Sequence, residues 1–95
     1  MEIVSIDVSQ LPPPEPMKEI LLALSALSSK QCLEVKHSRQ PFPLYEKLLA
    51  ASWCYHCQLT EKNKEHEQIF LYIYRAELQS DVTKFLLTQY PSATS

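Results

Sequence analysis

The chain has 95 residues, of which 45% are hydrophobic and 21% charged, with a formal net charge of -2 at pH 7. This length predicts one small domain with its own core, and the mildly negative charge disfavours nucleic acid or an anionic membrane as a partner. No apolar run is long enough to span a bilayer and the N-terminus lacks a basic segment followed by an apolar one, so we expect a cytoplasmic protein.

Two strand–helix units are predicted in the first half of the chain. β-branched residues at 3–8 predict a strand with Val4, Ile6 and Val8 toward the core. From Pro14 onward the helical spacing of apolar residues predicts a helix with the stripe Met17, Ile20, Leu21, Leu24 and Leu27. Alternation over 31–37 predicts a second strand, with one face made of Leu33, Val35 and His37.

The second half predicts a helix, a strand pair and a last helix. Residues 43–51 form a short helix with Pro43 at its first position and the stripe Leu44, Leu48 and Ala51. Residues 53–59 and 69–76 are aromatic and rich in strand formers, so we expect an antiparallel pair joined by the polar loop 60–68. Ser80 is the expected cap of a final helix that carries Val82, Phe85 and Leu86, and 88–95 is expected to fray.

The order β-α-β-α-β-β plus a C-terminal helix predicts an α+β fold. We expect a two-layer sandwich: a four-stranded mixed sheet with two helices on one face, because right-handed crossovers place both helices on the same side. Residues 1–78 form the predicted domain, and 79–95 the C-terminal helix and tail. Phe70, Tyr72 and Tyr74 alternate with aliphatic residues, so both faces of the last strand are apolar and a homodimer surface is one expectation.

Two motifs carry a family resemblance. The stretches "LPPPEPMKEILLALSAL" (11–27) and "CLEVKHSRQPFPLYEKL" (32–48), followed by an aromatic strand pair, resemble the TusA/SirA-like small domains. Within that group the chain is most similar to an uncharacterised domain-of-unknown-function branch, of which "HSRQPFPLY" looks like a second signature. The resemblance implies a four-stranded mixed sheet with two helices on one side.

The sulfur carriers of this group place a cysteine immediately before "PEP", where it accepts a persulfide, but this chain has Pro13 there. Proline has no thiol, so the resemblance implies the scaffold without sulfur transfer. We therefore expect a non-catalytic binding or adaptor module, with no cofactor and no catalytic residue, whose partner is an unknown protein or a small ligand.

Topology suggests where such a module makes contact. If the first two strands are parallel, the loops that follow them leave the same edge of the sheet, where α/β folds bind ligands. The candidate binding residues there are Glu15, His37, Arg39 and Tyr45. A structural interpretation stays open and is the more common outcome: His37 ends its strand, Arg39 pairs with Glu15, and Tyr45 packs its ring on the helix.

The pattern Cys54-Tyr55-His56-Cys57 raises a second function, thiol redox or sulfur transfer through Cys54 or Cys57. Residues three apart in a strand point to opposite faces about 10 Å apart, whereas a disulfide needs Cα atoms within about 7 Å, so the two cannot bridge if the strand forms. A metal site would also need ligands from another strand, such as Cys32 and His37, and we predict none. The odd count of three cysteines favours free thiols.

Overall fold

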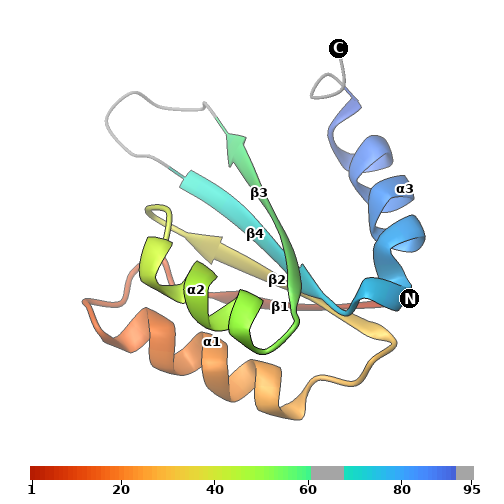
Figure 1. Ribbon diagram of the computed structural model, residues 1–95. Coiled ribbons are helices and arrows are strands. Elements are labelled where there is room, and N and C mark those ends of the chain that lie inside the picture. Colours follow the sequence, from red (N-terminus) through yellow and green to blue (C-terminus); the bar gives the residue numbers. More distant parts are fainter. Residues whose placement is uncertain (61–67, 92–95) are drawn as a thin grey trace.

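The described part of the chain contains one sheet and three helices (Figure 1). A computed structural model describes residues 1–60 and 68–91. In chain order the elements are β1 (Glu2–Asp7), α1 (Glu15–Ala26), β2 (Gln31–His37), α2 (Phe42–Ala50), β3 (Cys54–Thr60), β4 (Gln68–Tyr74), a 3-10 turn (Ala76–Leu78) and α3 (Gln79–Gln89). The predicted order of elements is confirmed, and each predicted strand or helix of residues 3–76 is within a few residues of its observed bounds. Of the predicted polar loop 60–68, Thr60 and Gln68 belong to β3 and β4, and 61–67 lie outside the described residues.

The sheet has the strand order β1-β2-β4-β3. β1 and β2 are parallel, with Val4 opposite Leu33, while β4 runs antiparallel to both β2 and β3. This confirms the predicted α+β fold with a four-stranded mixed sheet. Because β1 and β2 are parallel neighbours, the loops that enter α1 and α2 leave the sheet at one edge, which sets the position of the candidate site.

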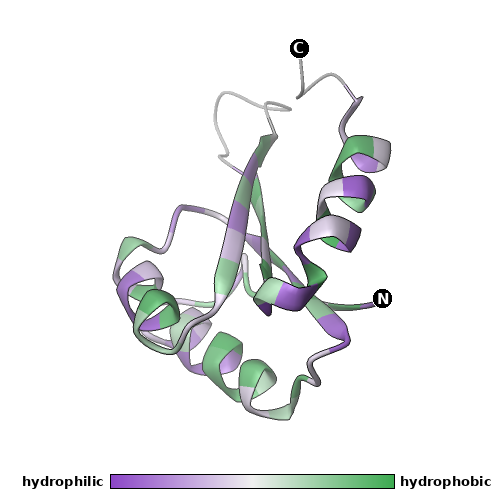
Figure 2. Ribbon diagram, turned by 45° about the vertical axis from the view of Figure 1, so that its right-hand side comes forward, coloured by the Kyte–Doolittle hydropathy of each residue, from purple (hydrophilic) through white to green (hydrophobic). Residues whose placement is uncertain are grey.

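Each face of the sheet has its own core. α1 and α2 cover one face and α3 lies on the other, as Figure 2 shows. The side chains of Leu33 and Val35 are fully buried under α1 and α2, whereas Cys32 and Tyr72 are fully buried in the cluster that includes Val82 of α3. This division follows from the alternation of side chains along β2, since successive residues point to opposite faces.

Two residues of the predicted helical stripes are not in the core. Leu21 is 40% exposed, because the buried stripe of α1 is centred on Ile20 and Leu24, and Leu21 lies about 100° around the helix from Ile20. Ala51 is exposed because α2 ends before it. Both residues instead lie beside the space between the C-terminal ends of α1 and α2.

α2 ends in a Schellman motif built without glycine. Trp53 N–H donates to Leu48 O at 2.8 Å and Ser52 N–H donates to Leu49 O at 3.1 Å, which is the pairing that defines the motif. Ser52 has φ of 62°, in the left-handed region that glycine usually occupies at this position. The chain has no glycine. The motif turns the chain sharply into β3 and places Trp53 beside α2.

α3 begins and ends differently from the prediction. Its first residue is Gln79 and it has no side-chain cap, so the expected cap at Ser80 is wrong; the preceding 3-10 turn leads directly into the helix. Tyr90, expected to fray, lies with its hydroxyl 2.7 Å from that of Tyr72, which donates to Glu34 Oε2 at 2.8 Å. The end of α3 is thereby tied to the sheet.

The predicted contact surface of a homodimer is partly occupied within the chain. Phe85 and Leu86 are half-buried against the cluster that contains Tyr72, and the Phe85 and Tyr72 rings meet edge to face at 5.7 Å. Oligomerisation itself stays a prediction. In the described part of the chain, no helix has both the length and the apolar character needed to cross a membrane.

Candidate functional site

A hollow of about 280 Å³ lies at the edge of the sheet where β1 and β2 end. It is enclosed by the segment that enters α1 and the segment that enters α2, and we call it the loop hollow. Its lining residues are Leu11, Pro13, Pro14, Pro16, Met17, His37, Ser38, Arg39, Gln40, Pro41 and Pro43. The structure therefore brings His37 and Arg39 together at this edge, with Pro13 beside them.

His37 is held in one hydrogen-bonding state. Its side chain is only 5% exposed, and Nδ1 accepts a hydrogen bond from Arg39 N–H at 3.2 Å. Burial lowers the pKa of His37 below its ordinary value of 6.5, and the nearby Arg39 charge lowers it further. The neutral ring with Nδ1 as acceptor carries its proton on Nε2. Nε2 makes no hydrogen bond to the described residues, and no fully buried side-chain N or O of those residues lacks a partner, so Nε2–H keeps some exposure. His37 is one of the residues that line the hollow.

The other two predicted residues do not line the hollow. Glu15 is exposed at the first position of α1, and no ion pair joins it to Arg39 in the described part of the chain. The Tyr45 ring stacks on Tyr55 with centroids 4.4 Å apart, and its hydroxyl donates to Gln40 Oε1 at 3.3 Å. Tyr45 thus meets the hollow through Gln40, and its ring packs on β3, whereas the structural interpretation placed it on the helix.

The two helix N-termini offer few backbone donors to the hollow. Pro14, Pro16 and Pro43 have no N–H. The N–H groups of Glu15, Phe42 and Leu44 already donate to Pro12 O, Gln40 O and Pro41 O. Anion binding of the helix N-terminal type needs several free amides, so the polar groups that remain are the side chains of His37, Ser38, Arg39 and Gln40.

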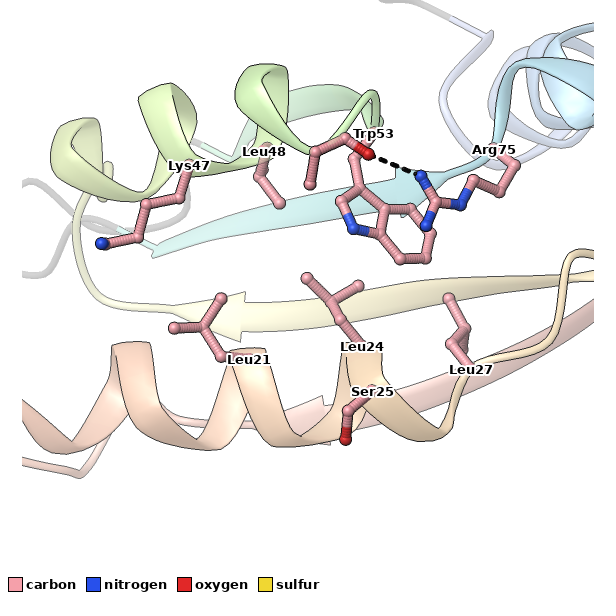
Figure 3. A pocket seen from close by; sticks show the side chains of 9 residues that line it. Leu21, Leu24, Ser25, Leu27, Lys47, Leu48, Trp53 and Arg75 are labelled. Atoms are coloured by element: carbon pink, nitrogen blue, oxygen red, sulfur yellow. Dashed lines mark hydrogen bonds between the residues drawn. The ribbon is translucent and has the colours of Figure 1, made fainter.

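A second hollow, of about 400 Å³, lies between the C-terminal ends of α1 and α2 (Figure 3). We call it the Trp53 hollow. Arg75 lies over the Trp53 ring, with its guanidinium carbon 3.5 Å from the ring centroid, and its Nη1 donates to Ala51 O at 2.8 Å. Sequence reasoning missed this site. The available signal was a lone tryptophan at the start of one predicted strand and an arginine at the end of its partner.

A third hollow, of about 460 Å³, separates β3 from α3 on the opposite face of the sheet. Its polar side chains bond to one another: the Tyr74 hydroxyl donates to Gln79 Oε1 at 3.1 Å, and His56 Nε2 lies 3.0 Å from Gln58 Oε1. Because these groups satisfy each other, this hollow has less capacity to recognise a ligand than the other two.

The three cysteines are free thiols, and the sheet separates Cys57 from Cys32 and Cys54. Cys54 packs on the α3 side and Cys57 on the α1–α2 side, which confirms that this pair points to opposite faces. Burial raises the pKa of Cys57, and it raises the pKa of Cys32 to about 12. Thiolates are the reactive form, so both thiols are held in the unreactive one. Among the described residues, no three His, Cys, Asp or Glu side chains lie close enough together to hold a metal.

Comparison with known proteins gives one family. The family described as "Uncharacterized conserved protein (DUF2249)" matches residues 5–71. This region contains every residue that lines the loop hollow, and it ends before Arg75 and α3. No curated protein and no solved structure matches the chain.

Proposed function

The chain belongs to the DUF2249 family of uncharacterized conserved proteins, and on this premise we propose that it is a non-catalytic binding module whose contact surface is the loop hollow. One observation carries the proposal. His37, whose Nδ1 accepts the Arg39 N–H and whose Nε2–H has no partner among the described residues, lines the hollow together with the Arg39 cation. The walls are formed by Pro13, Pro14, Pro16, Pro41 and Pro43. A fixed donor and a cation on stiff apolar walls suit recognition of a ligand.

The lining residues define the chemistry of that ligand. Leu11, Met17 and the five prolines offer apolar contact, and among the described residues no aspartate or glutamate lines the hollow. A hydrogen-bond acceptor with negative charge complements His37 Nε2–H and Arg39, which could hold a carboxylate with two N–H groups. Prolines restrict the conformations of the loops before binding, so the loops lose less conformational entropy when a ligand binds. The ligand is therefore an apolar group next to a carboxylate, as in an acidic chain end of a partner protein.

A TusA-like scaffold is part of the proposal. Two helices on one face of a four-stranded mixed sheet agree with what the resemblance implies. By the resemblance, Pro13 stands at the position of the carriers' persulfide cysteine; in this chain it lines the loop hollow. In this account the position that carries sulfur in those proteins is here part of a binding wall.

Thiol chemistry at Cys54 or Cys57 is the second candidate function, and the raised pKa of Cys57 weighs against that residue. Incubation of the purified protein with a sulfurtransferase and its sulfur donor, followed by mass spectrometry of the intact chain, separates the two functions. The binding module gains no mass. A gain of 32 Da on any cysteine would contradict the non-catalytic proposal.

Binding is tested by ¹H–¹⁵N spectra recorded during titration with N-acetylleucine, which joins an apolar side chain to a carboxylate. Saturable shifts at Leu11, Met17 and 37–40 are expected, with much smaller shifts for the neutral N-acetylleucinamide. Arg39→Gln should weaken binding about tenfold. The matched control is Lys30→Gln, an exposed cation in the turn at the opposite edge of the sheet, which should change nothing. Shifts that cluster elsewhere, or equal binding of the amide, would exclude the loop hollow as the contact surface.

A further inference from the structure

The Trp53 hollow combines apolar walls with a cation at each end. In Figure 3, Leu21, Leu24 and Leu27 on the α1 side face Leu48 and Trp53 on the α2 side. Lys47 lies at one end of this row and Arg75 at the other. Within residues 1–60 and 68–91, no aspartate or glutamate lines this hollow. Its volume of about 400 Å³ falls within the range of roughly 300–1,000 Å³ that is typical of small-molecule sites.

Arg75 is already positioned to receive an anion. Stacking on Trp53 and the hydrogen bond to Ala51 O hold its guanidinium in one orientation. In the described part of the chain the remaining N–H groups of Arg75 have no partner, and the only ion pair there joins Lys36 to Asp7. A cation that is ordered before binding loses little side-chain entropy when a ligand arrives.

The local charge favours an anion. The C-terminal ends of α1 and α2 each contribute about half a negative charge to this region. Arg75 and Lys47 together contribute two positive charges, so the helix ends and the two side chains sum to a net charge of about +1 around the hollow. The acidic residues of α1, Glu15 and Glu19, lie on the helix edge that faces away from α2, since Leu21 and Ser25 are the residues that face it.

We propose that the Trp53 hollow is a binding site for a small amphipathic anion, a carboxylate on a short aliphatic chain. The carboxylate binds the free N–H groups of Arg75, and the chain lies along Leu21, Leu24 and Leu27. Lys47 adds charge at the far end but makes no fixed contact. This site is independent of the loop hollow, because the two lie at opposite ends of the α1–α2 pair and share no lining residue.

The probe is sodium hexanoate, and the readout is the fluorescence of Trp53, the only tryptophan of the chain. We expect a saturable change with a millimolar Kd, matched by ¹H–¹⁵N shifts at Leu21, Ser25 and Arg75. Hexanamide and hexylammonium have the same apolar chain without the negative charge, so at equal concentrations they should give no saturable change. A linear response, or the same response to hexanamide, would overturn the proposal.

Variants separate ligand binding from a purely structural role of Arg75 as a cap on α2. Arg75→Gln should lower hexanoate affinity at least about tenfold and Lys47→Gln about threefold. Lys84→Gln, which changes an exposed cation of α3 on the opposite face of the sheet, should leave the affinity unchanged. If Arg75→Gln does not fold, Lys47→Glu decides, since Lys47 is exposed and its side chain makes no hydrogen bond in the described part of the chain. That reversal of charge should weaken binding about tenfold, and unchanged affinity would contradict the site.

Discussion

Arg75 lies over Trp53, with its guanidinium carbon 3.5 Å from the ring centroid. The pair of strands explains the contact: β3 and β4 place Cys54 opposite Tyr74, so the residues one step beyond, Trp53 and Arg75, also meet. The same arginine bonds to Ala51 O just past the end of α2. One side chain therefore joins the end of β4, the start of β3 and the end of α2, and it forms one end of the Trp53 hollow.

Arg75→Ala should lower the free energy of unfolding by about 1–2 kcal/mol, because it removes a cation–π contact and a charged hydrogen bond in a half-buried position. Urea unfolding followed by circular dichroism measures the change. Arg39→Ala is the matched control: Arg39 is exposed and its side chain makes no hydrogen bond in the described residues, so its loss should stay within about 0.5 kcal/mol. Equal losses of unfolding free energy in the two variants would show that the contacts of Arg75 do not stabilise the fold.

Ser52→Gly should stabilise the protein by about 0.5–1 kcal/mol. A serine at φ of 62° has the steric cost of a Cβ in the left-handed region, which glycine lacks. Ser29→Gly is the control, since Ser29 lies in a turn but does not have positive φ, and there glycine should cost about 0.4–1 kcal/mol through the entropy of the unfolded chain. Urea unfolding of both variants measures these changes. A destabilised Ser52→Gly would contradict the steric cost inferred for Ser52.

Acid should destabilise the protein through His37. Burial holds the pKa of folded His37 below 6.5, so the unfolded chain binds a proton more readily than the folded one. Stability from this residue is complete above about pH 6.5 and is lost as the pH falls toward the folded pKa. The expected result is a urea midpoint that declines between pH 7 and pH 5.5 in the wild type and declines less in His37→Gln. If an NMR titration gave folded His37 a pKa above 6.5, protonation would stabilise the fold, which would contradict this prediction.

The three thiols should differ in reactivity. Alkylation of the folded protein with iodoacetamide at pH 8 should leave Cys32 unmodified, because it is fully buried and burial raises its pKa to about 12. Cys57 should react slowly, because it is partly buried and burial raises its pKa. Peptide mass spectrometry identifies the sites, and the unfolded chain in urea serves as the reference in which all three react. Rapid alkylation of native Cys57 would revive the thiol-based function.

The regular parts of the fold were predictable because local patterns determine them. Alternation placed the strand at Gln31–His37 correctly to the residue, and the parallel arrangement of β1 and β2 brings His37 and Arg39 to one edge. Helical periodicity alone does not show which side of the apolar stripe of α1 is exposed to solvent, so the sequence pattern places Leu21 in the core. Its exposure depends on the spacing between α1 and α2.

Contacts between distant residues were not predictable from the sequence. The pairing of Trp53 with Arg75 requires the register of β3 and β4, which the polar loop between them does not specify. Tyr90 lies in a polar C-terminal segment with no sign of burial, and its position depends on Tyr72 and Glu34. In each case the two side chains are far apart in the sequence and become neighbours only when the sheet has formed.

The central claim is that the loop hollow binds a ligand through His37 and Arg39. An isotope-filtered NOESY spectrum of ¹³C,¹⁵N-labelled protein with unlabelled N-acetylleucine tests it most directly. The account predicts intermolecular NOEs from the leucine methyl groups to Leu11, Met17 and the surrounding prolines, together with a shift of His37 Nε2. NOEs confined to Trp53 and Leu21, or none at any concentration that saturates the amide shifts, would contradict it.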